Sequence, residues 1–349
     1  MLGVGSGPQL DGDGGSAASW DAGPLATRDR TALAVLASVQ GLGPVTSGAL
    51  IAGLGSPSAV LERAEAPDAV PALVAASSYE LGDGSRRHAL SSAVAGLIVD
   101  AAHRRSDILA GIERLELRVV AIGDPEYPAR LRTIEFPPTI LFVRGDPRAF
   151  AVDRAVAVVG TRRPSDAGRR TASRIAAAIA RAGGLVVSGL AVGIDGAAHA
   201  AAVLEGRPTV AFIGSGHARL FPPVHDRLAD AIVGAGGAIA SEYSPETEPT
   251  RGTFPRRNRL ISGSADAVVV VEAGARSGAL VTASWALEQG RECFVVPGPI
   301  DAVTSAGCNG FLRDCHGAAR IVAGVPQLLE DLGMAAAAGL EPPIRPPAP

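Results

Sequence analysis

Lysine is absent from the 349 residues, so all 32 basic residues are arginine. Any phosphate bound by this chain would therefore meet planar guanidinium groups, which can donate two parallel hydrogen bonds to one anion. The 35 acidic residues leave a formal net charge of -3, so overall charge does not attract the chain to nucleic acid. Binding to a nucleic acid would have to depend on where the arginines gather.

Three other scarcities narrow the class of protein. Cys293, Cys308 and Cys315 show no C-x-x-C spacing, which argues against a disulfide framework or a zinc site and fits a reducing compartment. Aromatic residues make up 4% of the chain, so the core must be aliphatic. No apolar run approaches the roughly 18 residues that span a bilayer, and the N-terminus lacks the basic-then-apolar order of a secretory signal. We therefore expect a cytoplasmic protein without a metal site or a membrane partner.

Composition and periodicity divide the chain into four segments. Residues 1–28 are rich in Gly, Ser and Asp without periodicity, which predicts a disordered leader. Residues 29–115 predict a helical N-terminal domain, and residues 116–333 predict a Rossmann-like domain. The Ala- and Pro-rich residues 334–349 predict a disordered tail.

Within the N-terminal domain, apolar residues recur at roughly helical spacing over residues 31–64. The spacing is interrupted by Gly41-Leu42-Gly43-Pro44, where glycines permit unusual backbone angles and Pro44 can begin a helix. Two short helices joined in this way resemble a helix-hairpin-helix, which can present backbone N–H groups to a phosphate. An ordinary helical hairpin, or a protein-docking module of the same shape, fits the pattern equally well.

In the second half of the chain, short apolar runs alternate with helical segments. The predicted strands are Ala155–Val159, Leu185–Val187, Thr209–Ile213, Ala238–Ala240, Ala267–Val271 and Cys293–Val296. The predicted helices between them are Asp166–Ala182, Ile194–Leu204, Val224–Gly234 and Ala279–Gln289. Unbroken apolar strands that alternate with helices indicate a parallel sheet buried on both faces. Such a doubly wound α/β fold binds its ligands at the carboxyl ends of the strands.

The end of the first of these strands carries groups that suit an anion. Gly160 lets the backbone approach a ligand, Thr161 and Ser165 offer hydroxyl groups, and Arg162 offers forked donors. The helix that follows adds its positive end. The run is neither G-x-G-x-x-G nor G-x-x-x-x-G-K-[ST], which disfavours a dinucleotide cofactor and an NTPase P-loop. We therefore expect a phosphate to bind here.

The second strand ends in Ser188-Gly189, and glycines bracket the turn that leads to Asp195. Asp195 stands where a helix N-cap or first turn is expected, so capping explains it as well as a ligand contact does. One turn further on, His199 is an isolated histidine on an Ala-rich helix. Such a residue is more often structural than catalytic.

Two later segments add charge. Arg251–Arg259 holds four arginines with no acid among them and includes Phe254. Guanidinium groups can bind phosphates while a ring contacts bases, so this stretch suits a nucleic-acid strand. Glu272 ends the valine-rich strand, and we expect it to fix nearby arginines by ion pairing, with a catalytic carboxylate as the alternative. The chain offers no Ser-His-Asp order and no metal-ligand spacing that would complete a catalytic site.

These motifs occur together in one family. In order, they are Gly160-Thr161-Arg162, SGLAVGIDGAAH (Ser188–His199), FPRRNRLISG (Phe254–Gly263), VVEAGARSGALVTASWALEQGRECFVVPGPI (Val270–Ile300) and Gly307-Cys308-Asn309. The chain therefore resembles the DNA-processing protein A (DprA/Smf) family over most of residues 155–320. This resemblance implies an extended Rossmann-like, doubly wound, mostly parallel sheet that follows a small helical (helix-hairpin-helix or SAM-like) domain.

The resemblance also implies a function. It predicts a homodimer that binds single-stranded DNA without base specificity, protects incoming strands and loads the RecA recombinase in natural transformation. The dimer would form at the end of the Rossmann-like domain, where Phe311, Leu312 and Ile321 are apolar. The predicted DNA and phosphate contacts are Gly160, Thr161, Arg162, Ser165, Ser188, Gly189, Phe254, Arg256, Arg257, Asn258, Arg259, Arg276, Ser277 and Gly278. No catalytic residue, cofactor or metal ligand is predicted.

Two other functions fit part of the pattern. A nucleotide-processing enzyme such as a phosphoribohydrolase, on a related Rossmann-like fold, would use a P-G-G-x-G-T loop with a Glu. Pro297-Gly298-Pro299 does not fit that loop. An interaction protein could instead use the same arginines to bind an acidic partner. A nucleotide hydrolysis panel tests the first alternative, and affinity for oligo-dT at two salt concentrations tests the second.

Overall fold

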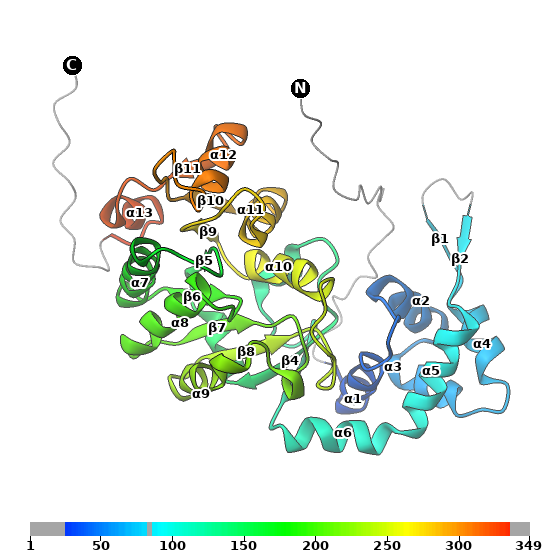
Figure 1. Ribbon diagram of the computed structural model, residues 1–349. Helices are drawn as coiled ribbons and strands as arrows, with labels where there is room; N and C mark the ends of the chain where they lie inside the picture. The colour runs from blue at the N-terminus through cyan, green and yellow to red at the C-terminus, as the bar shows by residue number, and fades with distance from the viewer. Residues whose placement is uncertain (1–24, 82–85, 336–349) are drawn as a thin grey trace. The chain divides into compact units, whose positions relative to one another are not determined.

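The computed structural model describes residues 25–81 and 86–335, and the chain separates into two units between Ala110 and Gly111 (Figure 1). Residues 1–24 of the predicted leader and 336–349 of the predicted tail lie outside the described residues. Helix α1 begins at Thr27, so the last two residues assigned to the leader belong to a helix.

The first unit is a small helical domain with one hairpin. Its elements are α1 (Thr27–Leu36), α2 (Pro44–Leu54), α3 (Pro57–Ala64), α4 (Ala69–Ala76), β1 (Tyr79–Leu81), β2 (Arg86–His88), α5 (Ser92–His103) and the first part of α6 (Arg105–Arg114). Pro44 begins α2 as predicted, and Gly41 has a φ of +85° in the turn before it. Leu36, Leu50 and Leu61 meet in one buried cluster. The antiparallel pair β1–β2 was not predicted from the sequence.

The second unit contains a nine-stranded sheet with the strand order β11-β10-β9-β5-β6-β7-β8-β4-β3. The strands are β3 (Arg118–Ala121), β4 (Ile140–Gly145), β5 (Ala155–Val159), β6 (Leu185–Ser188), β7 (Thr209–Phe212), β8 (Ala238–Ser241), β9 (Ala267–Val270), β10 (Glu292–Val295) and β11 (Ala319–Ile321). Strand β4 pairs antiparallel with both of its neighbours, and every other pair is parallel. This topology confirms the predicted doubly wound, mostly parallel fold.

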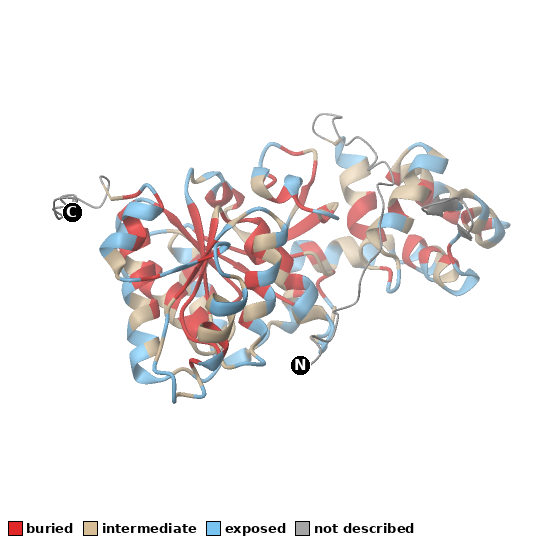
Figure 2. Cartoon of the chain, turned by 90° about the horizontal axis from the view of Figure 1, so that it is seen from above, coloured by how far each residue is buried: buried red, intermediate tan, exposed pale blue. Residues whose placement is uncertain are grey.

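Helices cover the sheet because its central strands are apolar on both faces. They are α7 (Asp166–Arg181), α8 (Ile194–Leu204), α9 (Asp226–Gly234), α10 (Thr253–Gly263), α11 (Gly278–Glu288), α12 (Ala306–Asp314) and α13 (Val325–Asp331). Figure 2 shows the strands of this sheet as buried, with exposed residues on the outer sides of the helices.

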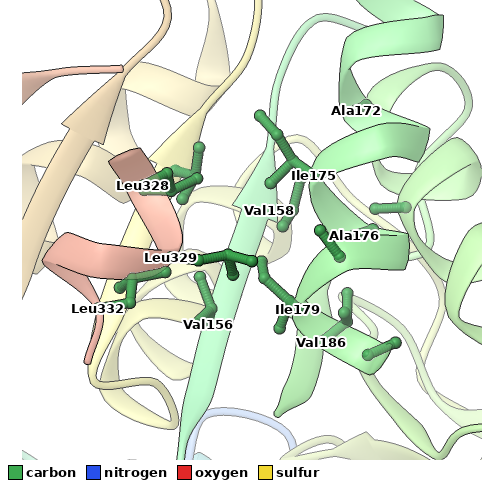
Figure 3. Close-up of a cluster of buried hydrophobic side chains, with 14 of the residues drawn as sticks. Val156, Val158, Ala172, Ile175, Ala176, Ile179, Val186, Leu328, Leu329 and Leu332 are labelled. Carbon is green, nitrogen blue, oxygen red and sulfur yellow. The ribbon is translucent and has the colours of Figure 1, made fainter. Parts of the chain in front are cut away.

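One core cluster joins α7, α8 and α13 to the central strands. Val156 and Val158 of β5 face Ile175 and Ile179 of α7, and Leu329 of α13 completes the contact (Figure 3). The same cluster contains Met334, which is 4% exposed. Assigning that residue to a disordered tail was therefore wrong.

The strand order reverses direction at β5. The chain proceeds from β5 through α7 to β6 on one side, and later returns as β9 on the other side before it continues through α11 to β10. Crossover connections are right-handed, so helices that follow opposite directions of travel lie on opposite faces. The loops after β5 and β9 consequently diverge at one point of the carboxyl edge, and doubly wound folds bind ligands at such a point.

Candidate functional site

The loop after β5 is fixed to its neighbours through its backbone. The Thr161 N–H donates to the carbonyl oxygen of Glu272 at 2.6 Å, and the Thr161 carbonyl accepts from the Ile194 N–H at 3.2 Å. A Cβ on Gly160 would lie 2.5 Å from Ile194, so only glycine fits between β5 and α8. The Thr161 amide is therefore used inside the fold, and this loop presents the side chains of Arg162 and Arg163 to solvent.

The positive end of α7 already holds a carboxylate. Glu272, which is 6% exposed, accepts hydrogen bonds from both the N–H and the hydroxyl group of Ser165, each 3.0 Å from Oε2. The Ser165 hydroxyl also accepts the Gly168 N–H at 3.0 Å and so caps the helix. A Cβ on Gly168 would lie 1.8 Å from Oε2, so this glycine makes room for the carboxylate. The prediction that Glu272 pairs with arginines was wrong, and Ser165 faces a carboxylate where a phosphate was expected.

The loop after β6 lies deeper than expected. Ser188 is fully buried, and its hydroxyl donates to the carbonyl of Val158 at 2.7 Å. Gly189 is buried as well, and its N–H donates to Asp195 at 3.1 Å. Asp195 therefore closes the preceding loop, and no side-chain hydrogen bond caps α8. Burial raises the pKa of the Asp195 carboxyl, although the nearby Arg257 opposes that shift.

His199 occupies an interior position between α8 and β7. Its Nδ1 lies 2.8 Å from the Thr209 hydroxyl, and the side chain is fully buried. Burial lowers the pKa of His199 to about 3, with smaller contributions from the charges of His225 and Arg257. The ring is neutral at physiological pH, as a structural histidine would be.

Two arginines of the basic stretch point into the molecule. Arg257 is 4% exposed, and its Nη1 donates to the carbonyl oxygens of Gly189, at 2.6 Å, and Phe212. Burial lowers its pKa to about 10. Arg259 is 8% exposed and forms an ion pair with the equally buried Glu242. Neither guanidinium group lies on the surface, so the prediction that both contact DNA directly does not match their positions.

Arg256 and Asn258 of that stretch differ from these two arginines in their surroundings. Helix α10 turns Arg256 to solvent, whereas Asn258 donates to the carbonyl oxygen of Gly278 at 3.1 Å and so joins α10 to the start of α11. Ser277 caps α11 by accepting the Ala279 N–H at 3.3 Å.

Phe254 is half-buried, and the Arg162 guanidinium lies over its ring at 5.2 Å from the centroid. The structure thus brings together the two predicted clusters, since Arg162 follows β5 and Phe254 begins α10. Arg276, exposed in the loop after β9, is another outward arginine of this edge. Throughout residues 25–81 and 86–335, no ion-pair partner is available to Arg162 or Arg276. Their charges remain open to an anionic ligand.

The predicted DNA and phosphate contacts did not include Phe221. This residue follows β7, and its ring centroid lies 5.7 Å from that of Phe254. An aromatic residue shortly after a predicted strand end was the available signal, but nothing in the sequence indicated that the two rings meet. Gly214 in the same loop makes the approach possible, because a Cβ there would lie 2.9 Å from the Phe254 ring.

Three further observations concern a groove, a metal site and a membrane span. A groove of about 800 Å³ runs along α7, α8 and α13, and none of the predicted site residues lines it. Within the described part of the chain, no group of three or more His, Cys, Asp or Glu residues could hold a metal ion. Nor does any single described helix have the length and apolarity to cross a membrane, although the bent pair α2 and α3 passes that test jointly.

Comparison with known proteins identifies relatives of the second unit. The sequence model of a family described as DNA recombination-mediator protein A matches residues 118–333. DNA processing protein DprA of Bacillus subtilis (strain 168) is 39% identical over 193 residues, which are 55% of this chain and 65% of the relative. A putative DNA processing protein DprA of Mycobacterium tuberculosis (strain H37Rv) is 40% identical over 242 residues, which are 66% of this chain and 61% of the relative. The match spans less than two thirds of the length of these curated relatives.

Solved structures agree with the sequence matches. DNA processing protein A from Streptococcus pneumoniae superposes with a TM-score of 0.61 at 30% identity, and the match covers 78% of this chain and 95% of that one. DNA processing protein A from Helicobacter pylori, whose structure was described for its single-stranded DNA binding mode, gives a TM-score of 0.56 at 26% identity. That match covers 62% of this chain and 97% of the other.

Proposed function

The chain belongs to the DNA recombination-mediator protein A family, and from that premise we propose that it binds single-stranded DNA at the carboxyl edge of its sheet. The bound strand would be an incoming or processed single strand that the protein protects and passes to the RecA recombinase. The protein would act by binding, without catalytic turnover.

The observation that carries this proposal is the contact between Arg162 and Phe254. An exposed guanidinium that has no ion-pair partner among the described residues lies beside a half-buried aromatic ring, at the edge where the strand order reverses. Phosphates would contact Arg162, Arg256 and Arg276, and bases would lie toward the ring. Contacts to the backbone carry no sequence information, so binding would tolerate any sequence.

The remaining predicted residues would support this surface from below. Arg257 ties the strand ends of β6 and β7 together through two carbonyl oxygens, and Glu272 anchors the loop that carries Arg162. A flexible single strand can follow the loops at a sheet edge more readily than a wide, stiff duplex can. We therefore expect single strands to be preferred over duplexes.

The experiment is the salt dependence of oligo-dT affinity for the wild type and Arg162→Ala. Each lost phosphate contact lowers the slope of log affinity against log salt by about 0.7 for a single strand. We expect Arg162→Ala to weaken oligo-dT and mixed-sequence strands alike and to lower the slope by about that amount. The matched control is Arg207→Ala, because Arg207 is exposed but precedes β7 and so lies at the opposite edge of the sheet. A folded Arg162→Ala protein with the affinity and slope of the wild type would remove this loop from the site.

We further propose a homodimer formed at the end of the sheet. Strand β11 is an edge strand, and Ile321 on it is 56% exposed. Edge strands offer unpaired backbone groups to a second chain. Ile321→Glu should therefore give a monomer in light scattering at micromolar concentration where the wild type is a dimer. A monomeric wild type would contradict the proposal.

No observation favours the nucleotide-processing alternative. Gly298 exchanges two hydrogen bonds with the Asn309 side chain, at 3.2 and 2.9 Å, so the loop after β10 is closed upon α12. Sustained hydrolysis of nucleotides or DNA by the pure protein, lost on mutation of Glu272 or Asp195, would contradict a function by binding alone.

A further inference from the structure

The loop after β7 exposes an aromatic ring beside the proposed DNA site. Phe221 is 40% exposed, and its ring is inclined by 57° to that of Phe254 with the centroids 5.7 Å apart. Strand β7 is the neighbour of β6 in the sheet and runs parallel to it. The loop that carries Phe221 therefore leaves the same edge as the loops after β5 and β6.

The neighbouring ring of Phe254 is less open to a base. The Arg162 guanidinium lies over this ring, and the backbone of Gly214 approaches it so closely that a Cβ would come within 2.9 Å. Phe254 thus contacts both other side chains, and we call this succession of contacts, from Arg162 through Phe254 to Phe221, the row. One end of this row is a charge and the other is an exposed aromatic ring.

We propose that Phe221 is a stacking platform for an unpaired nucleobase of the strand whose phosphate contacts Arg162. This inference rests on the proposed function, and it assigns a role to a residue outside the predicted site. Every base has a π-face, so stacking on a single ring adds affinity without sequence preference. A base held in a duplex is paired and stacked on both sides, so the same ring would also favour single strands.

The salt dependence separates this contact from the phosphate contacts. Stacking releases no counterions, so loss of the Phe221 ring lowers affinity while it leaves the slope of log affinity against log salt unchanged. Loss of Arg162 changes both. The two residues are therefore distinguishable in one titration series even though they lie in the same row.

The test uses the full chain and two fluorescent strands of equal length, oligo-dT and an abasic strand with the same phosphates. We expect Phe221→Ala to weaken oligo-dT about tenfold at unchanged slope and to leave affinity for the abasic strand unaltered. Phe221→Leu keeps an apolar contact with Phe254 and should show most of the same loss, whereas Phe221→Tyr should bind as the wild type does. Phe136→Ala is the control, because Phe136 is the other exposed phenylalanine of the described residues, at 44%, and should have no effect.

The results distinguish failure of the stacking role from failure of the proposed function. An equal loss on both strands, or no loss on oligo-dT, with melting temperatures near that of the wild type would overturn the stacking role alone. A wild-type protein that binds neither strand would overturn the proposed function, and the stacking role with it.

Discussion

The guanidinium group of Arg257 donates to carbonyl oxygens at the ends of β6 and β7, and its charge is nearly enclosed. Removing it would leave the Gly189 and Phe212 carbonyls without their donor and open a void beneath the loops. Each buried polar group left without a partner costs about 1–3 kcal/mol. We therefore expect Arg257→Ala to lower the free energy of unfolding by about 3 kcal/mol, measured by urea denaturation.

The neighbouring Arg256→Ala variant is the matched control, because Arg256 is exposed and its side chain makes no hydrogen bond within the described residues. Exposed substitutions of this kind change stability by about 0.5 kcal/mol or less. Arg256→Ala should instead lower the salt slope of oligo-dT binding by about 0.7, and Arg257→Ala should not. An Arg257→Ala protein as stable as the wild type, with a reduced slope, would place this guanidinium at the DNA after all.

This pair of residues shows what the sequence left undecided. The charge pattern does not distinguish Arg256, Arg257 and Arg259 from one another. Only their positions around a helix decide which of these side chains are exposed and which are buried. The helix itself was not predicted, because Pro255 interrupts the pattern. Proline is tolerated in the first turn of a helix, where its missing N–H has no partner to lose, and Pro255 stands in that turn of α10.

At the scale of an element, the first turn of α7 depends on the fit between Gly168 and Glu272. Alanine favours a helix over glycine by about 1 kcal/mol, yet a Cβ at this position would lie 1.8 Å from the Glu272 carboxylate. Gly168→Ala should expel the carboxylate from Ser165 and destabilise the protein by about 1–2 kcal/mol, because two hydrogen bonds to a buried charge are lost.

A double-mutant cycle tests that explanation. In a Glu272→Ala background the conflict is gone, so the same Gly168→Ala change should become stabilising by about 1 kcal/mol. Gly96→Ala in α5 is the control for propensity alone, since a Cβ there meets no atom within 4 Å. Equal effects of Gly168→Ala in both backgrounds would show that Glu272 does not hold this helix end.

Strands were easier to predict than the contacts between their ends. The sequence placed the parallel strands β5–β10 within one or two residues, because unbroken Ala and Val runs are typical of buried strands. Strand β11 has three residues, one of them Arg320, and was missed for lack of such a run. The position of Glu272 on α7 could not be predicted either, since it depends on residues more than 100 positions apart.

At the scale of the whole molecule, a net charge of -3 conceals a local excess of cationic side chains. Arg162, Arg256 and Arg276 come from three different segments and share the carboxyl edge only because the parallel sheet aligns its strand ends. The alternation of apolar strands with helices predicted this edge as part of the fold. Which arginines reach its surface was decided by packing.

The second unit also encloses two histidines whose titration affects its stability. His199 touches Thr209, and Nε2 of His217 lies 2.9 Å from the carbonyl oxygen of Phe142. Burial lowers the pKa of His199 to about 3 and that of His217 to about 4, from an ordinary value of 6.5. Below about pH 6.5 the unfolded chain therefore binds protons that the folded protein does not. Stability from these residues is complete above that pH and is lost as the pH falls.

Buried carboxyls act in the opposite direction. Burial raises the pKa of Asp195 and of Glu242, so the folded protein takes up their protons before the unfolded chain does. Their contribution to stability is complete below the pKa that these carboxyls have in the unfolded chain. It is lost as the pH rises through their pKa in the folded protein. The change in the wild type's free energy of unfolding with pH therefore combines gains and losses. The contribution of a single histidine has to be isolated by substitution.

His199→Gln isolates that histidine. Between pH 6.5 and pH 5, each buried neutral histidine contributes a loss of about 1.4 kcal/mol per pH unit to the free energy of unfolding, or about 2 kcal/mol for His199. Urea denaturation at pH 7 and pH 5, followed by tryptophan fluorescence, measures that loss in the second unit, because Trp285 lies in α11 and Trp20→Phe in both proteins removes the other tryptophan. The variant will be less stable at both pH values because its packing is disturbed, but its loss between them should be smaller by about 2 kcal/mol. An identical loss in both proteins would mean that His199 gains its proton in the folded state as readily as in the unfolded chain, and that its enclosure between α8 and β7 opens at mildly acidic pH.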